Sequence, residues 1–262
     1  MTDLSGRVAL ITGASSGIGA ATARLLAARG CGIAINFSKS RTAAEAVAAE
    51  CRKSGVDTLL VQGNVASDTD CRRIVDEAVS HFGHLDYLVN NAGTTKFVAH
   101  KDLAGLSAQD FHDIYAVNTI GPFQMVRAAE PYLRATKGAI VNVSSIAGVV
   151  AVGSSLAYVA SKAALNGLTL GLARVLAPEV RINSVCPGFV EGEWLKQGMG
   201  ETAYEALRAG WAAMAPLGRT NTAADIAENI AFFLTSAPNI TGETLMIDAG
   251  MRLAAPRPAA GR

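Results

Sequence analysis

Short apolar or β-branched runs alternate with helical patterns along the whole chain, and this alternation restricts the possible folds more than any other feature. Several runs are continuously apolar, which is typical of parallel strands that are covered on both faces. Parallel strands joined through helices form βαβ units with right-handed crossovers. The chain is therefore predicted to be α/β, with one doubly wound parallel sheet of about seven strands and helices on both faces.

The residue patterns also give approximate bounds for each element. Strands are predicted over Val8–Thr12, Gly32–Asn36, Thr58–Gln62, Tyr87–Asn90, Ala139–Val143, Arg181–Val185 and Thr244–Ile247. Helices are predicted near Gly17–Arg29, Ala43–Lys53, Asp68–His81, Ala108–Thr136, Ala157–Ala177 and Ala223–Leu234. No repeat or linker divides the chain, so residues 1–253 are predicted to form one domain, and 254–262, with its Pro, Ala and Gly content, a loose tail.

Two segments depart from the regular alternation. The predicted helix Ala108–Thr136 is long and contains Gly121–Pro122, which should kink or locally break it. Residues 191–219 follow a strand and place Trp194, Trp211 and other apolar residues among polar ones. Such an insertion could be a lid of one or two short helices over a pocket, or a surface excursion that packs its own apolar residues.

Composition excludes several classes of protein. The 262 residues are 17% charged with a net charge of +1, so the chain is globular and has no basic surplus for nucleic acid or acidic lipid. It contains neither a signal pattern nor an apolar run of roughly 18 residues, which predicts a cytoplasmic protein without membrane association. The four cysteines show no disulfide or zinc spacing, and His81 and His84 have no third ligand nearby in the sequence, so no metal site is predicted.

A glycine-rich turn lies between the first predicted strand and the first predicted helix. It runs Thr12-Gly13-Ala14-Ser15-Ser16-Gly17-Ile18-Gly19. Gly13 allows a tight turn, Gly17 lets the backbone approach a pyrophosphate, and Gly19 permits close packing of helix against strand. Because the helix N-terminus offers free N–H groups and a positive dipole end, this turn is predicted to bind a dinucleotide.

A second cluster surrounds the only charged residue between Lys137 and Arg174, which is Lys162. Tyr158 precedes it by four residues, so both side chains share one helix face. A nearby ammonium favours the ionised phenol, and we expect the pKa of Tyr158 to fall. Ser145 ends an apolar strand thirteen residues before Tyr158, and these three residues form a candidate acid–base site.

The glycine spacing and the motifs in order resemble those of the short-chain dehydrogenase/reductase family over about Gly6 to Leu253. The chain contains Thr-Gly-x-x-x-Gly-x-Gly at 12–19, Asn-Asn-Ala-Gly at 90–93, Asn118, Ser145, Tyr158-x-x-x-Lys162, Pro187-Gly188, Ile-Thr-Gly at 240–242 and Asp-Ala-Gly at 248–250. The resemblance implies a Rossmann-like fold and an oxidoreductase that transfers a hydride between a nicotinamide cofactor and a carbonyl or secondary alcohol.

The resemblance also assigns roles to residues. It implies that Tyr158 is the general acid or base, that Lys162 lowers its pKa and holds the nicotinamide ribose, that Ser145 binds the substrate carbonyl, and that Asn118 maintains a proton-passing water. The family's spacing selects Ser145 over Ser144. Cofactor contacts are expected from the 12–19 turn (Gly13, Ser15, Ser16, Gly17, Ile18 and Gly19), from Asn64, Val65, Asn91, Ala92, Gly93, Pro187, Gly188 and Val190, and from Tyr158 and Lys162 themselves. Two departures are Asn64 where Asp is usual and Gly192 where Thr is usual.

The end of the second predicted strand bears on the choice between NAD and NADP. An acidic residue there would bind the adenosine ribose 2′-hydroxyl and repel a 2′-phosphate. The chain instead has Ser38-Lys39-Ser40 and no carboxylate until Glu45, which resembles NADP-dependent members. Ser16 stands where many of those carry a basic residue, and Lys39 could be a solvated helix-entry charge. NADP(H) is predicted to be preferred, with NAD(H) possible.

Substrate and assembly are less constrained. The expected pocket wall includes Thr94, Lys96, Phe97, Ile146, Val152, Phe189 and the segment Glu191–Arg219. This mostly apolar lining is compatible with a ketone, a hydroxysteroid-like ring, a sugar or an acyl thioester. The nearest branch in appearance is the 3-oxoacyl-carrier-protein reductases, although Pro178-Glu179 stands where these usually have basic residues. Alternatives are a non-catalytic nucleotide sensor and a sugar-nucleotide epimerase, a class whose chains are generally longer. The predicted helices Ala108–Thr136 and Ala157–Ala177 carry excess apolar surface, and members of the family are usually tetramers, so a homotetramer is predicted.

Overall fold

The computed structural model of the protein describes residues 2–254, so all but Ala254 of the predicted tail lies outside the described residues. The strands are β1 Val8–Ile11, β2 Gly32–Phe37, β3 Thr58–Gln62, β4 Tyr87–Asn90, β5 Ala139–Val143, β6 Arg181–Pro187 and β7 Thr244–Ile247. The α-helices are α1 Gly17–Ala27, α2 Arg41–Arg52, α3 Asp68–Phe82, α4 Ala108–Tyr115, α5 Gly121–Thr136, α6 Ala147–Val150, α7 Leu156–Leu176, α8 Glu193–Met199, α9 Glu201–Met214 and α10 Ala223–Thr235. Every predicted strand is confirmed: four have the predicted bounds, and β1, β2 and β6 end one or two residues away from the predicted end.

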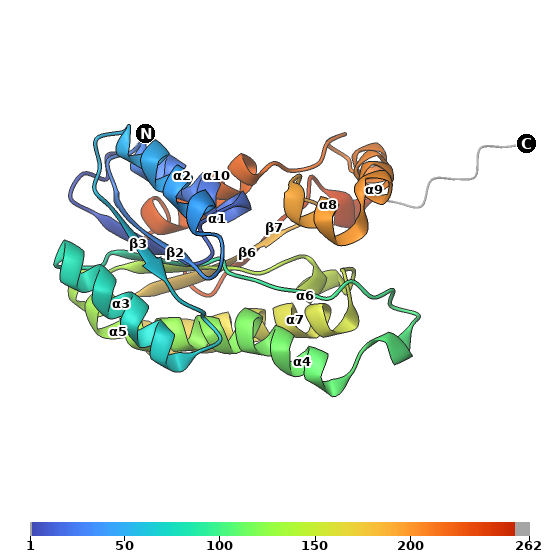
Figure 1. Cartoon of the computed structure of the whole chain (residues 1–262), viewed down its shortest axis with the longest axis horizontal. Coiled ribbons are helices and arrows are strands. Elements are labelled where there is room, and N and C mark those ends of the chain that lie inside the picture. The colour runs from blue at the N-terminus through green and yellow to red at the C-terminus, as the bar shows by residue number, and fades with distance from the viewer. Residues whose placement is uncertain (1, 255–262) are drawn as a thin grey trace, which may run out of the picture.

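Within the described residues the strands form one parallel sheet of seven, in the order β3-β2-β1-β4-β5-β6-β7. Figure 1 shows α1, α2 and α10 on one face of this sheet and α3, α5 and α7 on the other. The predicted doubly wound α/β fold is therefore confirmed. Strand order reverses between β1 and β4, and open sheets of this kind bind ligands outside the carboxyl ends of the strands at such a point.

Each face of the sheet has its own buried core, because successive side chains of a strand point to opposite faces. Ile11, Ile33 and Ile35 pack in the core under α1 and α10. Leu10, next to Ile11 in the sequence, and Leu88, its partner on β4, belong to the core under α3 and α5. Continuous apolar strands are needed because both faces are buried.

The long segment 108–136 is interrupted, as predicted, but the break lies just before Gly121–Pro122. Residues Ala116–Ile120 form a π-helical turn, called η2, between α4 and α5. Gly121 begins α5 and packs so closely on Val65 that a Cβ would lie 2.9 Å from its carbonyl oxygen. A π-turn inserts an extra residue into a helix and is frequent at functional sites.

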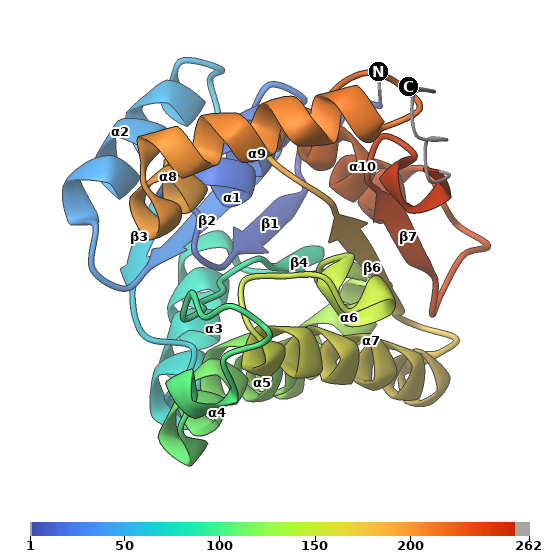
Figure 2. The same cartoon turned by 90° about the vertical axis from the view of Figure 1, so that its right-hand side faces the viewer.

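The insertion at 191–219 forms two helices, α8 and α9, and its role as a lid stays a prediction. Both views place α8 and α9 near the carboxyl ends of the strands, on the same side of the sheet as α1 and α10 (Figures 1 and 2). A short parallel bridge between Val190 and Asn221 joins the two ends of the insertion. Among residues 2–254, no helix is long and apolar enough to cross a membrane.

Candidate active site

Strand β5 ends beside the predicted catalytic serine. Ser145 lies two residues beyond Val143, where the chain turns into the short helix α6. Its Oγ accepts a hydrogen bond from the backbone N–H of Ala147 at 3.1 Å, and its hydroxyl also hydrogen-bonds the phenol of Tyr158. The turn after β5 therefore holds the Ser145 hydroxyl against the phenol.

Helix α7 positions Tyr158 and Lys162. Ser155, which is fully buried, caps the helix by accepting a hydrogen bond from the N–H of Tyr158 at 3.3 Å. One turn later, Nζ of Lys162 donates to the carbonyl oxygen of Val143 at 2.8 Å and lies 5.7 Å from the centre of the Tyr158 ring. The predicted pair thus shares a helix face and meets the end of β5.

Burial, rather than the lysine, dominates the ionisation of this pair. Burial raises the pKa of Tyr158 to about 12, although the Ser145 hydrogen bond opposes the rise. Burial also lowers the pKa of Lys162 to about 8, because the ammonium loses its hydration. The expectation that the pKa of Tyr158 is lowered is therefore wrong for the protein without cofactor or substrate. The phenol holds its proton at neutral pH.

Asn118 occupies the π-turn and is completely buried. Its Oδ1 accepts from the N–H of Thr94 at 2.8 Å, and its Nδ2 donates to the carbonyl oxygen of Thr94 at 2.9 Å and to Oγ of Ser161 at 3.0 Å. Ser161 in turn donates to the carbonyl oxygen of Tyr158 at 2.8 Å. Asn118 therefore ties the loop after β4 to helix α7.

The glycine-rich turn has the backbone geometry that its predicted roles require. Gly13 has φ +61°, and a Cβ there would lie 2.9 Å from Cα of Ala92. A Cβ on Gly19 would lie 2.5 Å from Nδ2 of Asn91, so α1 packs directly on the end of β4. Gly17 has φ +53°, and among the described atoms nothing would lie within 4 Å of its Cβ, so this backbone faces open space at the start of α1. The turn can receive a diphosphate.

Two polar residues that sequence reasoning missed hold this turn in place. Asn36 is buried, accepts from the N–H of Gly13 at 3.4 Å and donates to the carbonyl oxygens of Val61 and Gly63. Thr12 accepts from the N–H groups of Asn91 and Ala92 at 3.0 and 3.1 Å. A polar residue at the end of an otherwise apolar strand was the signal for Asn36.

The predicted adenosine end lies at the carboxyl ends of β2 and β3. Ser38, Lys39 and Ser40 are exposed there, and within the described chain the hydroxyl of Ser40 makes no capping bond to α2. Asn64 is also exposed, and its side-chain carbonyl accepts from the N–H of Ala66 at 3.1 Å. Val65 is buried against α5. An amide oxygen has two lone pairs, so Asn64 keeps one acceptor site for adenine.

Gly93, Pro187, Gly188 and Val190 surround the other end of the site. A Cβ on Gly93 would lie 3.6 Å from Oδ1 of Asn118 and 3.7 Å from Nζ of Lys162. Pro187 is the last residue of β6, and Gly188 packs on Asp248. The lack of a side chain at Gly93 leaves room beside the lysine. The structure therefore brings the residues of both predicted ends to one edge of the sheet.

Gly192 directly precedes α8, at the position where the family pattern predicts threonine. Its N–H donates to the hydroxyl of Tyr204 at 3.3 Å, and the hydroxyl of Thr220 donates to Glu191 at 2.5 Å. Behind this segment, Phe189 is buried between the rings of Tyr204 and Trp211. Phe189 thus packs against α9 instead of forming an open pocket wall.

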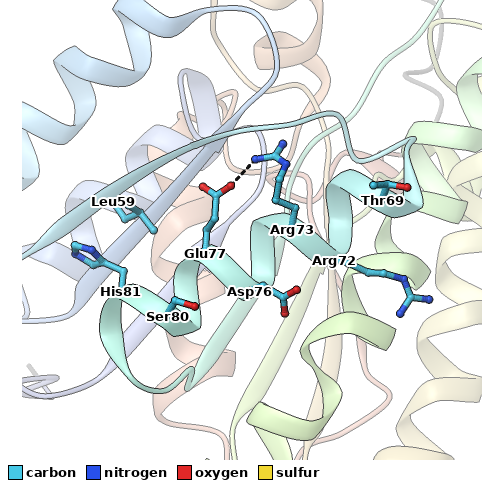
Figure 3. A pocket seen from close by; sticks show the side chains of 8 residues that line it. All are labelled: Leu59, Thr69, Arg72, Arg73, Asp76, Glu77, Ser80 and His81. Carbon is cyan, nitrogen blue, oxygen red and sulfur yellow. Dashed lines mark hydrogen bonds and ion pairs between the residues drawn. The ribbon is translucent and has the colours of Figure 1, made fainter.

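An open hollow also lies beside the edge strand β3, against α3. Figure 3 shows its lining, with the side chains of α3 on one side and Leu59 on the other. The charges there are mixed, and Arg73 and Glu77 pair with each other at 2.6 Å. The lining contains none of the predicted site residues.

In residues 2–254, no group of three or more His, Cys, Asp or Glu could hold a metal ion, and the four cysteines are buried free thiols.

Comparison with known proteins agrees with this geometry. Residues 13–252 match the family described as enoyl-(acyl carrier protein) reductase, which spans almost the whole chain. The 3-oxoacyl-[acyl-carrier-protein] reductase FabG of Staphylococcus aureus is 38% identical over 246 residues, covering 93% of this chain and 97% of that protein.

Solved structures agree as well. A Burkholderia xenovorans protein assigned to the short-chain dehydrogenases/reductases superposes with a TM-score of 0.88 at 40% identity, covering 94% of this chain and 98% of its own. A xylitol dehydrogenase with bound NAD+ superposes with a TM-score of 0.86 at 31% identity, covering 94% of this chain and 99% of its own. The family match at 13–252 includes Gly13–Gly19, the Tyr158–Lys162 helix and residues 191–219.

Proposed function

Because the chain belongs to the short-chain dehydrogenase/reductase family, we propose that it is an NADP(H)-dependent oxidoreductase with Tyr158 as its general acid or base. The family acts on CH–OH or C=O groups with a nicotinamide cofactor. One observation carries the assignment of residues: the hydroxyl of Ser145, the phenol of Tyr158 and the ammonium of Lys162 meet at the end of β5. Each is the residue type that carbonyl reduction requires.

The residues present fit a nicotinamide dinucleotide. The open backbone of Gly17, the start of α1 and the space beside Gly93 would hold its diphosphate and its ribose near Lys162. When bound in its reduced form, the cofactor supplies hydride to a carbonyl carbon.

The chain's own residues handle the proton. The phenol of Tyr158 would donate its proton to the carbonyl oxygen, while the Ser145 hydroxyl holds that oxygen by a hydrogen bond. Burial keeps the pKa of Tyr158 high, so the proton is in place at neutral pH. This favours carbonyl reduction, where the site must supply an acid.

The key experiment compares Tyr158→Phe with Tyr132→Phe in an assay of nicotinamide absorbance with a panel of ketones and alcohols. Tyr132 is also partly buried but lies on α5, away from the site, so its variant controls for loss of a hydroxyl. We expect Tyr158→Phe to lower kcat by about 10²-fold or more. Full turnover by Tyr158→Phe would refute the acid–base role.

Preference for NADP(H) is supported by the exposed Ser38-Lys39-Ser40 segment at the start of α2. The first carboxylate after this segment in the sequence is Glu45 on α2, and it forms an ion pair with Arg41 at 3.8 Å. Steady-state kinetics with both cofactors test the preference, and Ser38→Asp should shift efficiency towards NAD(H) through repulsion of the 2′-phosphate. Equal or better efficiency of the unmodified protein with NAD(H) would overturn it.

A second candidate is reduction of 3-oxoacyl groups carried on acyl carrier protein. The identity to the Staphylococcus aureus enzyme supports it. The segment after α7 weakens this candidate, because the acidic Glu179 lies there and forms an ion pair with Arg134 at the surface. Arg134 is therefore not free to bind an acidic carrier protein. Assays with an acetoacetyl-carrier protein beside simple ketones separate the two candidates.

We also propose a homotetramer and a cytoplasmic location. The tetramer is supported by apolar side chains that α5 and α7 expose, namely Phe123, Leu170 and Val175. The location is supported by the free thiol state of the four described cysteines, which is usual in a reducing compartment. Residues 1–253 are proposed to act as one domain, with 191–219 as the lid.

A further inference from the structure

The lid helix α8 places an aromatic side chain beside the catalytic phenol. The ring centre of Trp194 lies 6.4 Å from that of Tyr158 and 6.0 Å from that of Phe97, which comes from the loop after β4. Trp194 is 49% exposed, although it is a large apolar residue. A half-exposed indole at the reacting group offers a flat surface to a ligand.

A glycine on the same helix holds this arrangement. The ring of Phe97 packs on Gly198 so closely that a Cβ at this position would overlap it. Gly198 follows Trp194 by four residues, which is about one turn, so both lie on the helix face that meets Phe97. Gly210 on α9 is different, because a Cβ there would meet nothing within 4 Å in the described chain.

The lid also carries an excess of negative charge. Residues 191–219 contain four glutamates against one lysine and two arginines. All three basic side chains are paired, Lys196 with Glu201 at 3.1 Å, Arg208 with Glu205 at 2.9 Å, and Arg219 with Asp225 on α10. Lys96, near Phe97 in the sequence, pairs with Asp110 at 2.9 Å. Such a rim repels phosphate-bearing substrates and acidic carrier proteins.

We propose that Trp194 and Phe97 determine substrate specificity, and that the substrate is an uncharged carbonyl compound with a flat, apolar body that stacks on Trp194. Gly198 is a positioning residue that sets the distance between the two rings. This inference rests on the proposed oxidoreductase function, because it places the stacked carbonyl next to Tyr158 and Ser145. Coenzyme A thioesters and carrier-bound thioesters are disfavoured by the acidic rim.

Binding is tested first, without turnover. Trp211→Phe leaves Trp194 as the sole indole, because the chain has two tryptophans. We expect 1-tetralone, a flat neutral ketone, to quench the fluorescence of this variant and acetoacetyl-coenzyme A not to. Trp194→Ala, made in the unmodified protein, should raise the Kd for 1-tetralone by about tenfold in equilibrium dialysis. Leu207→Ala, an exposed apolar position on α9, should leave the Kd unchanged.

Kinetics then separate positioning from general damage. Gly198→Ala should raise KM for 1-tetralone with a smaller change in kcat, whereas Gly210→Ala should leave both unchanged. Tighter binding of acetoacetyl-coenzyme A than of 1-tetralone, or equal effects of Trp194→Ala and Leu207→Ala, would overturn the inference. Absence of turnover with every substrate would refute the oxidoreductase function alone, since the fluorescence and dialysis results still decide the stacking site.

Discussion

Nζ of Lys162 donates a hydrogen bond to the carbonyl oxygen of Val143 across 2.8 Å, so helix α7 is held to the last residue of β5. Lys162 is only 3% exposed, and this acceptor is neutral. A buried ammonium without a carboxylate partner is costly. The site therefore carries an electrostatic strain that should appear in the pH dependence of stability.

The first prediction concerns Lys162→Met. Burial lowers the pKa of Lys162 to about 8 from its usual 10.5, so between these values the unfolded chain binds a proton that the folded chain does not. The free energy of unfolding should therefore rise with pH in this window, relative to the variant, by about 3 kcal/mol. Below pH 8 the difference should be constant. Tyr158 is present in both proteins, so its contribution to the pH dependence cancels in the difference between them.

Urea unfolding of both proteins from pH 7 to 10.5 provides the measurement. Lys101→Met is the control, because Lys101 is exposed and its removal should give a difference that does not change with pH. A pH-independent difference for Lys162→Met would mean that the ammonium is well solvated or paired in the folded protein.

The second prediction concerns Asn118→Ala. The change leaves the N–H and carbonyl of Thr94 and the Oγ of Ser161 without their buried partner. We expect a loss of about 2–3 kcal/mol in the free energy of unfolding, together with a lower kcat. Asn229→Ala is matched to it, since Asn229 donates one amide bond to the backbone of Asp225 at a part-buried position. A cost no larger than that of Asn229→Ala would contradict the bridging role of Asn118.

The third prediction concerns Gly19→Ala. A methyl group at Gly19 would lie 2.5 Å from Nδ2 of Asn91 and 2.8 Å from the carbonyl oxygen of Gly13, so the glycine-rich turn must shift. Cofactor affinity, measured by calorimetric titration, should fall at least tenfold. Gly210→Ala makes the same change on an open helix face and should keep the affinity. Unchanged affinity for Gly19→Ala would show that the turn does not bind the cofactor.

The fourth prediction concerns assembly. Leu170 on α7 is 52% exposed, and Gly167 and Gly171 beside it have open space above them among the described atoms, so a second helix could approach closely. Leu170→Glu should convert the proposed tetramer to smaller species in light scattering at micromolar concentration. Leu103→Glu, which is also an exposed leucine but lies in a short 3₁₀ turn at 103–105, should not. A monomeric unmodified protein would refute the tetramer outright.

Local patterns determined much of this protein. Continuous apolar runs predicted every strand, because both faces of the sheet are buried, and the turn at 12–19 predicted where α1 begins. The spacing of Tyr158 and Lys162 predicted a shared helix face, since 3.6 residues make one turn. Ser145 needed the family's spacing as well, because the residues alone did not separate it from Ser144.

Other properties depend on contacts between residues distant in the sequence, and only the tertiary structure decided them. The pKa of Tyr158 rises because packing removes water from the phenol, and burial separately lowers the pKa of Lys162. Asn36 and Thr12 became visible as supports of the glycine-rich turn only through their bonds to distant backbone groups. The contact of Phe97 with Gly198 and Trp194 joins the loop after β4 to helix α8, about a hundred residues later, and no local pattern encodes such a contact.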